Sequence, residues 1–186
     1  MKRVKTLSIR ETVLCASFIA FVAIGSLIRI PIGSTVYTLQ FLATLLAGQL
    51  LGGRLGAFAV IAYTVMGLIG IPVFASGGGP GYILQPTFGY LPAFALQAWV
   101  CGNLIRTPAQ PVTFKKQFLA NLAGLVIVYG IGIGYFYFMS RFILHSTMSF
   151  WLMFWYCAVL QIVPDTVICA AAAYIGQRCY RAGLWI

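Results

Sequence analysis

The feature that most constrains this 186-residue chain is a series of long stretches that contain no charged side chain. They cover residues 12–28, 30–53, 55–105 and 117–140, and a further, largely apolar stretch over 142–176 contains Asp165. A helix needs about 20 apolar residues to cross the roughly 30 Å hydrocarbon core of a bilayer. Hydrophobic residues make up 61% of the chain and the mean hydropathy is +0.96, outside the range of soluble domains. The sequence therefore predicts an integral membrane protein.

The lengths of these stretches predict the number of helices. Segment 55–105 is long enough for two crossings, the other stretches for one each, and the last crossing runs from about 150 to 177. The expected fold is an all-α integral membrane protein: a single domain over 1–186 that forms a bundle of six transmembrane helices. The basic start and apolar run of the first helix resemble a signal peptide. We expect it to be retained, because more membrane segments follow it.

The positions of lysine and arginine predict the orientation of the bundle. With both termini cytoplasmic, ten of the twelve basic residues fall on the inner side, and only Arg29 and Arg141 fall outside. Such a bias is the usual positive-inside pattern. The inner residues are Lys2, Arg3, Lys5, Arg10, Arg54, Arg106, Lys115, Lys116, Arg178 and Arg181.

Composition and missing motifs exclude several function classes. The net charge of +10 is dispersed over short loops and forms no basic stripe, so we expect no nucleic-acid partner. The five cysteines are scattered without a CxxC pair, which predicts neither a disulfide framework nor a metal site. No GxxxxGK[ST] phosphate-binding pattern is present, so the chain does not handle ATP. We therefore expect no cofactor.

One of the two acidic residues, Asp165, lies within the last apolar stretch. An ionisable side chain at membrane depth costs several kcal/mol and usually has a partner or a function. Asp165 is thus the first candidate for a binding residue. A proton relay would need several titratable groups along a path, and an intramembrane enzyme would need a base and an orienting group near the acid. No histidine lies in a helical stretch. A proton relay and an intramembrane enzyme are therefore both weaker hypotheses than a ligand-binding protein.

Two segments between helices carry candidate ligand-binding groups. Segment 70–89 is rich in glycine and contains three prolines, so it cannot form one helix. Its aromatic rings, polar tips and closely approachable glycine backbone suit a binding lid; the alternative is a surface hairpin with interfacial aromatics. Segment 31–40 adds hydroxyl and amide groups where the chain re-enters the membrane. The candidates are Phe74, Ser76, Gly78, Tyr82, Gln85, Phe88 and Tyr90 in the first segment, and Tyr37, Thr38 and Gln40 in the second.

Helix one carries two small residues, Ala16 and Ala20, one turn apart on the same face. In lipid, small residues let a second helix approach closely, which is a main source of helix association. This face predicts a contact either with a neighbouring helix of the same bundle or with a partner protein.

Five motifs together carry a family resemblance. They are VYTLQ (36–40), LLAGQLLGGRLG (45–56), GIPVFASGGGPG (70–81), PTFGYLPAF (86–94) and VPDTV (163–167). In this order and at these spacings the chain resembles the BioY family of biotin-uptake proteins, which are substrate-binding S-components of energy-coupling factor (ECF) transporters. The resemblance implies a six-helix protein of the bacterial cytoplasmic membrane that is not an enzyme. It also implies a pocket near the outer surface and a coupling protein, docked at Ala16 and Ala20, that works with separate ATPases.

The resemblance also suggests roles for the candidate residues toward biotin. Ionised Asp165 would accept the ureido N–H groups, and Ser76 and Gln40 would donate to the ureido carbonyl. Phe74, Tyr82 and Tyr90, with Tyr129 a weaker candidate, would line the ring and tail. The family generally has a lysine where this chain has Ile168. Arg29 or Arg141 would then hold the ligand carboxylate. A biotin precursor or another small carboxylated vitamin remains an alternative ligand.

Overall fold

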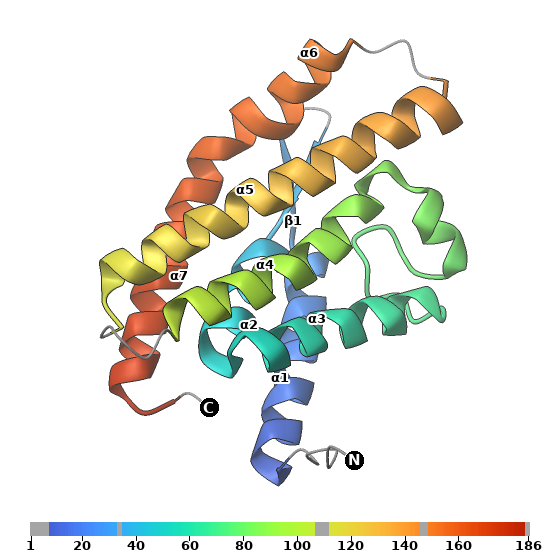
Figure 1. Ribbon diagram of the computed structural model, residues 1–186. Coiled ribbons are helices and arrows are strands. Elements are labelled where there is room, and N and C mark those ends of the chain that lie inside the picture. The colour runs from blue at the N-terminus through green and yellow to red at the C-terminus, as the bar shows by residue number, and fades with distance from the viewer. Residues whose placement is uncertain (1–7, 33–34, 107–111, 146–148, 185–186) are drawn as a thin grey trace, which may run out of the picture.

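The computed structural model describes residues 8–32, 35–106, 112–145 and 149–184, with the side chains of 30–37 outside the description. The described part is almost entirely helical (Figure 1). The α-helices are α1 (Ile9–Leu27), α2 (Gln40–Leu51), α3 (Gly53–Leu68), α4 (Tyr90–Ile105), α5 (Phe114–Phe138), α6 (Phe150–Phe154) and α7 (Leu160–Arg181). Short 3₁₀ turns occupy Pro80–Leu84 and Pro86–Gly89, and π-helical turns occupy Met139–Ile143 and Trp155–Val159.

Four of the helical segments in the described part are long and apolar enough to cross a membrane. They are Ile9–Leu27, Pro86–Ile105, Phe114–Ile143 and Phe150–Arg181, while α2 and α3 are shorter apolar helices. The last segment joins α6, a π-helical turn and α7, and contains Pro164. The expectation of an all-α membrane protein is therefore confirmed.

The segment after α1 differs from the expected loop. Strands β1 (Arg29–Ile32) and β2 (Thr35–Thr38) form a two-stranded antiparallel hairpin in which Arg29 pairs with Thr38 and Ile30 with Tyr37. Because the hairpin uses the residues up to Thr38, α2 begins only at Gln40 and is 12 residues long. The amide of Gln40 is thereby fixed at the start of a buried helix.

The helices pack most closely where glycine removes a side chain. A Cβ on Gly48 of α2 would lie 2.5 Å from the carbonyl oxygen and 2.9 Å from the Cα of Ala98 in α4. A Cβ on Gly56 of α3 would lie 2.7 Å from the carbonyl oxygen of Ala47. The glycine cluster in segment 45–56 is therefore structural, because it brings three backbones together.

Buried amides connect α2, α5 and α7 inside the bundle. Gln49 Nε2 donates to Asn121 Oδ1 at 2.8 Å, and Asn121 Nδ2 donates to the carbonyl of Cys169 at 2.8 Å. Both amide side chains are buried. In an apolar surrounding such bonds fix the relative positions of the helices, because the alternative is an unsatisfied polar group.

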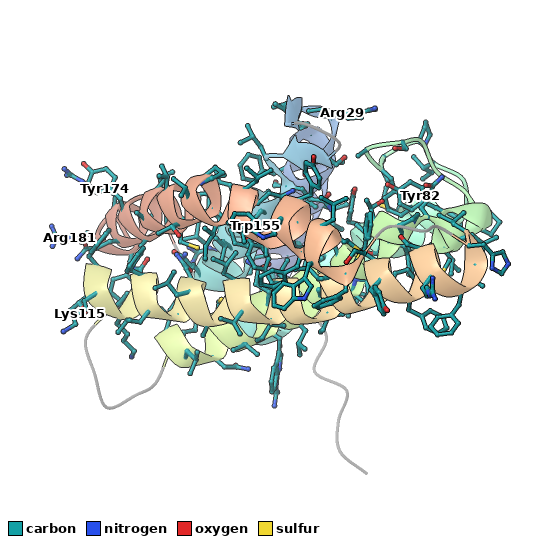
Figure 2. All side chains as sticks on the ribbon, turned by 90° about the horizontal axis from the view of Figure 1, so that it is seen from above. Arg29, Tyr82, Lys115, Trp155, Tyr174 and Arg181 are labelled. Carbon is teal, nitrogen blue, oxygen red and sulfur yellow. The ribbon has the colours of Figure 1, made fainter. Side chains whose placement is uncertain are left out.

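The two ends of the bundle are distinct in Figure 1. The end of α4, the start of α5 and the end of α7 lie on the left side of the view, whereas the start of α4, the end of α5 and α6 lie toward the right and top. Helix α1 packs against α2 and α3. In Figure 2, α1 lies toward the top of the view and α5 runs across its lower part.

Candidate functional site

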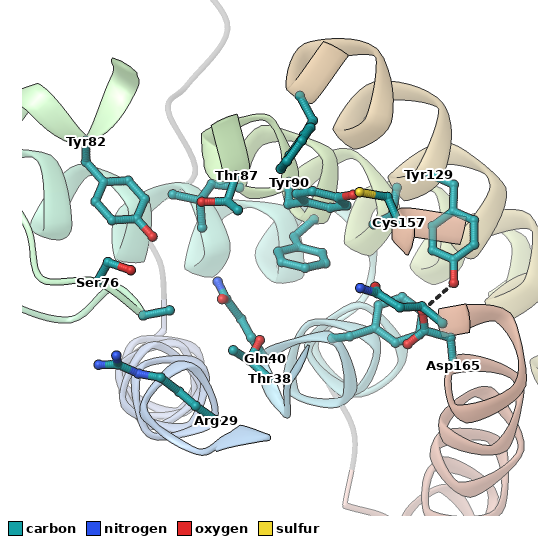
Figure 3. Close-up of a pocket in the computed structure, with 17 residues that line it drawn as sticks. Arg29, Thr38, Gln40, Ser76, Tyr82, Thr87, Tyr90, Tyr129, Cys157 and Asp165 are labelled. Carbon is teal, nitrogen blue, oxygen red and sulfur yellow. Dashed lines mark hydrogen bonds between the residues drawn. The ribbon is translucent and has the colours of Figure 1, made fainter. Parts of the chain in front are cut away.

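A cavity of about 230 Å³ lies where the hairpin, segment 70–89 and the helices α2, α4, α5 and α7 meet (Figure 3). Its walls are mainly apolar, with polar groups at a few places, which is the usual character of a small-molecule site. The lining residues are Arg29, Thr38, Gln40, Phe41, Ala75, Ser76, Tyr82, Thr87, Tyr90, Leu91, Phe94, Val128, Tyr129, Phe136, Cys157, Gln161 and Asp165.

Asp165 and Tyr129 form the polar pair at one end of the cavity. The Tyr129 hydroxyl donates to Asp165 Oδ2 at 2.6 Å (Figure 3). Asp165 is only 4% exposed. The bond connects α5 with α7, and Asp165 follows Pro164 in the helix. A carboxylate held in this way accepts hydrogen bonds only, so it suits a ligand that presents N–H donors.

Gln40 supplies a buried amide to the cavity. Its side chain is 5% exposed, and Nε2 has no hydrogen-bond partner among the described residues. An unsatisfied buried N–H group costs roughly 1 to 3 kcal/mol. Gln40 therefore favours a ligand that offers an acceptor oxygen to Nε2.

The other end of the cavity carries a positive charge. Arg29 in β1 and Ser76 in segment 70–89 lie near Tyr82, well away from Asp165 (Figure 3). Arg29 and Asp165 are the charged side chains among the lining residues, so the cavity has a cationic end and an anionic end. A ligand with N–H donors at one end and a carboxylate at the other complements this arrangement.

Aromatic rings form the wall between the two ends. The rings of Tyr90 and Phe94 are 6.5 Å apart, and those of Phe94 and Phe41 are 6.3 Å apart. The edge of Tyr90 lies against Gly132 of α5, where any Cβ would overlap the ring. The absence of a side chain at Gly132 thus sets the position of this wall.

Most, but not all, of the sequence candidates meet at the cavity. The candidates that line it are Arg29, Thr38, Gln40, Ser76, Tyr82, Tyr90 and Asp165, and the weaker candidate Tyr129 lines it too. Phe74 is 1% exposed, and its ring packs against Tyr82 and over Gly67, so it supports segment 70–89 from inside and does not line the cavity. Gly78 and Gln85 are exposed and also do not line it. The side chain of Tyr37 lies outside the described part of the structure.

The remaining candidates lie elsewhere. Ala16 and Ala20 are exposed on α1, so their face is not used for packing inside the described bundle. Arg141 lies in the π-helical turn after α5 and does not line the cavity.

Sequence reasoning missed several lining residues, including Thr87, Phe136, Cys157 and Gln161. Gln161 carries a usable signal, since it lies four residues before Asp165 and therefore on the same face of the helix. Cys157 lies in the π-helical turn Trp155–Val159 and contacts the Tyr90 hydroxyl. A π-helical turn rotates side chains relative to a regular helix, and no sequence pattern indicates it here.

The BioY family model matches residues 1–184 of the chain. The chain belongs to the BioY family. A protein of Lysinibacillus sphaericus named probable biotin transporter BioY is 41% identical over 97% of this chain and 90% of its own length. A protein of Pyrococcus horikoshii with the same name is 36% identical over 91% of this chain and 95% of its own length.

A solved structure supports the fold. The S-component for biotin from an ECF-type ABC transporter matches with a TM-score of 0.78 over 95% of both chains, at 24% sequence identity. In this BioY chain, Ile168 takes the position where the resemblance suggests lysine, and its side chain packs against the hydrophobic core. Arg29 is the cationic side chain among the described residues that line the cavity.

Proposed function

We propose that this chain binds biotin with high affinity as the S-component of an ECF transporter. The observation that carries the proposal is the polarity of the cavity, with Asp165 at one end and Arg29 at the other. Biotin has the matching order of groups: a ureido ring with two N–H donors and one carbonyl, an apolar ring and tail, and a terminal carboxylate. The names of the curated relatives support the same ligand.

Each group of biotin has a candidate partner in the cavity. Asp165, held by Tyr129, accepts from the ureido N–H groups, and Gln40 Nε2 donates to the ureido carbonyl. The rings of Tyr90 and Phe94 contact the apolar ring and tail. Arg29 pairs with the carboxylate, a charge-assisted interaction about twice as strong as a neutral hydrogen bond.

The proposed transport mechanism uses the two segments that cover the cavity. Biotin enters from outside while the hairpin and segment 70–89 are apart, and their closure removes it from water. Release inward requires the bundle to reorient against a coupling protein that is energised by separate ATPases.

We propose six crossings with both termini cytoplasmic in a bacterial cytoplasmic membrane. The gathering of Lys115 and Arg181 at one end of the bundle, with Arg29 far from them, supports this orientation (Figure 2).

Replacing Arg29 with glutamine tests the partner of the carboxylate. We expect R29Q to weaken the binding of biotin by roughly 10- to 100-fold, because an Arg–carboxylate pair is lost. Binding of biotin amide should change little, since it has no carboxylate. Isothermal titration of both ligands measures this difference. R141Q is the matched control, because Arg141 does not line the cavity. Equal losses for biotin and its amide in R29Q would place the carboxylate elsewhere.

Placing large side chains on the face of α1 that carries Ala16 and Ala20 tests the docking of the coupling protein. We expect the double variant Ala16→Trp, Ala20→Trp to bind biotin like the wild type but to lose most biotin uptake in cells, because two indole rings prevent close helix approach. Val126→Trp on α5 is a suitable control, since Val126 is 71% exposed and lies on another helix. Unchanged uptake in the double variant would exclude this face as the docking surface.

A further inference from the structure

Two buried hydroxyl groups converge on one loop carbonyl next to the cavity. Ser26 in the last turn of α1 and Tyr63 in α3 are both 0% exposed. The Tyr63 hydroxyl donates to the carbonyl of Val73 at 3.0 Å. The Ser26 hydroxyl contacts the same oxygen, and it shares its single proton with the carbonyl of Ala23 at 2.7 Å. Neither α1 nor α3 contributes a residue to the described lining of the cavity, so both hydroxyls reach the site through this loop.

The loop that carries the carbonyl covers residues 71–79, and we call it the 71–79 loop. It folds back on itself, because Phe74 and Gly77 exchange two backbone hydrogen bonds of 2.9 and 3.1 Å. Between these two residues lie Ala75 and Ser76, which line the cavity (Figure 3). The conformation of this short loop therefore sets part of the cavity wall.

Helix α3 supports the same loop by two further contacts. The ring of Phe74 lies 5.6 Å from the ring of Tyr63 and 4.5 Å from the ring of Tyr82, which lines the cavity. This ring fits because Gly67 of α3 has no side chain, and any Cβ there would overlap it. The carbonyl of Gly67 also accepts the N–H of Gly79 at 2.7 Å. The wall is thus supported from α3 by an aromatic ring, a backbone bond and a hydroxyl.

The convergence of the two hydroxyls has an energetic consequence for the loop. A buried hydroxyl without a partner is costly, so both groups favour the conformation that brings the Val73 carbonyl within reach. A carbonyl oxygen has two lone pairs and can accept from both. The loop is therefore held in its cavity-lining conformation before a ligand binds. A site that is ordered in advance loses less conformational freedom on binding.

We propose that Ser26 and Tyr63 are positioning residues for the ligand. By holding the carbonyl of Val73, they keep the 71–79 loop in place as a preformed part of the cavity wall, and they touch no ligand group themselves. The effect on biotin affinity rests on the proposed function, whereas the ordering of the loop in the empty protein does not.

The double variant Ser26→Ala, Tyr63→Phe tests the proposal, because it removes both hydroxyls and keeps the aromatic ring. In hydrogen-exchange mass spectrometry without ligand, we expect the 71–79 loop to exchange roughly tenfold faster than in the wild type, while α2, α4 and α5 keep their rates. Biotin binding should weaken by about tenfold, as expected when only about a tenth of the molecules hold the loop in place. Saturating biotin should restore slow exchange. Each single variant keeps one donor and should lose less than about threefold.

The matched control is Ser17→Ala, Thr64→Val, which removes one hydroxyl from each of the same two helices. Ser17 donates to the carbonyl of Val13 and Thr64 to that of Val60, each within its own helix. We expect this control to exchange and to bind biotin like the wild type.

Two results would overturn the proposal. One is unchanged exchange of the 71–79 loop in the variant that lacks both converging hydroxyls. The other is faster exchange spread equally over α2, α4 and α5, because the hydroxyls would then stabilise the whole bundle and not the loop. Since exchange is measured without ligand, it judges the positioning role even if the wild type binds no biotin.

Discussion

Exchanging Asp165 for asparagine is expected to weaken biotin binding by roughly 10- to 100-fold, or about 1.4 to 2.8 kcal/mol. Asparagine has nearly the same size, but it replaces one acceptor oxygen with an N–H donor. That donor would face a ureido N–H group of biotin or the Tyr129 hydroxyl, which now donates to Asp165 Oδ2 at 2.6 Å. Isothermal titration of the purified variant with biotin measures the change.

The control for this prediction is Tyr129→Phe. It removes the hydroxyl that positions Asp165 but keeps the carboxylate and the aromatic ring. We expect Y129F to weaken binding by less than D165N, because the carboxylate can still accept from the ligand. Thermal unfolding should show that both variants fold. Biotin affinity equal to that of the wild type in D165N would mean that Asp165 only connects α5 and α7.

Exchanging Gly48 for alanine is expected to destabilise the bundle by roughly 1 to 3 kcal/mol. In an isolated helix, alanine is better than glycine by about 0.5 to 1 kcal/mol. Here the added methyl group would lie 2.5 Å from the carbonyl oxygen and 2.9 Å from the Cα of Ala98. Both contacts are backbone atoms, so relief requires α2 and α4 to move apart. The thermal unfolding midpoint in detergent should fall by several degrees.

Gly130→Ala is the comparison variant, for which we expect no loss of stability. Gly130 lies within α5, and a Cβ at this position meets no atom within 4 Å. The unfolding midpoint should therefore stay the same or rise slightly, through the helix propensity of alanine. A midpoint for G48A as high as that of G130A would contradict the close approach of α2 and α4.

The sequence allowed the all-α membrane fold to be predicted, because apolar runs bounded by charges have few other solutions in a membrane. It did not allow the hairpin to be predicted. Strands β1 and β2 have only four residues each, and β1 contains Pro31, so the segment resembles a loop. The hairpin then shortens α2 to 12 residues, a length that the uncharged run 30–53 does not indicate.

The site could be predicted in part. Polar residues in apolar surroundings, such as Gln40 and Asp165, are conspicuous in sequence, because burying them has a cost. The contact between Tyr129 and Asp165 was not predictable, since it depends on how α5 and α7 are rotated and the residues are 36 positions apart. The role of Phe74 was also hidden, because an aromatic residue in a loop can face either the ligand or the core. In the structure Phe74 pairs with Gly77 in an isolated bridge, and its ring is buried.

Equilibrium binding of labelled biotin to the detergent-purified protein tests the proposed function most directly. Unlabelled biotin amide, desthiobiotin and lipoate serve as competitors. The proposal predicts saturable binding of one biotin per chain, with biotin amide a clearly weaker competitor because it cannot pair with Arg29. No saturable binding of biotin would contradict the proposal and would assign the cavity between Asp165 and Arg29 to a different ligand.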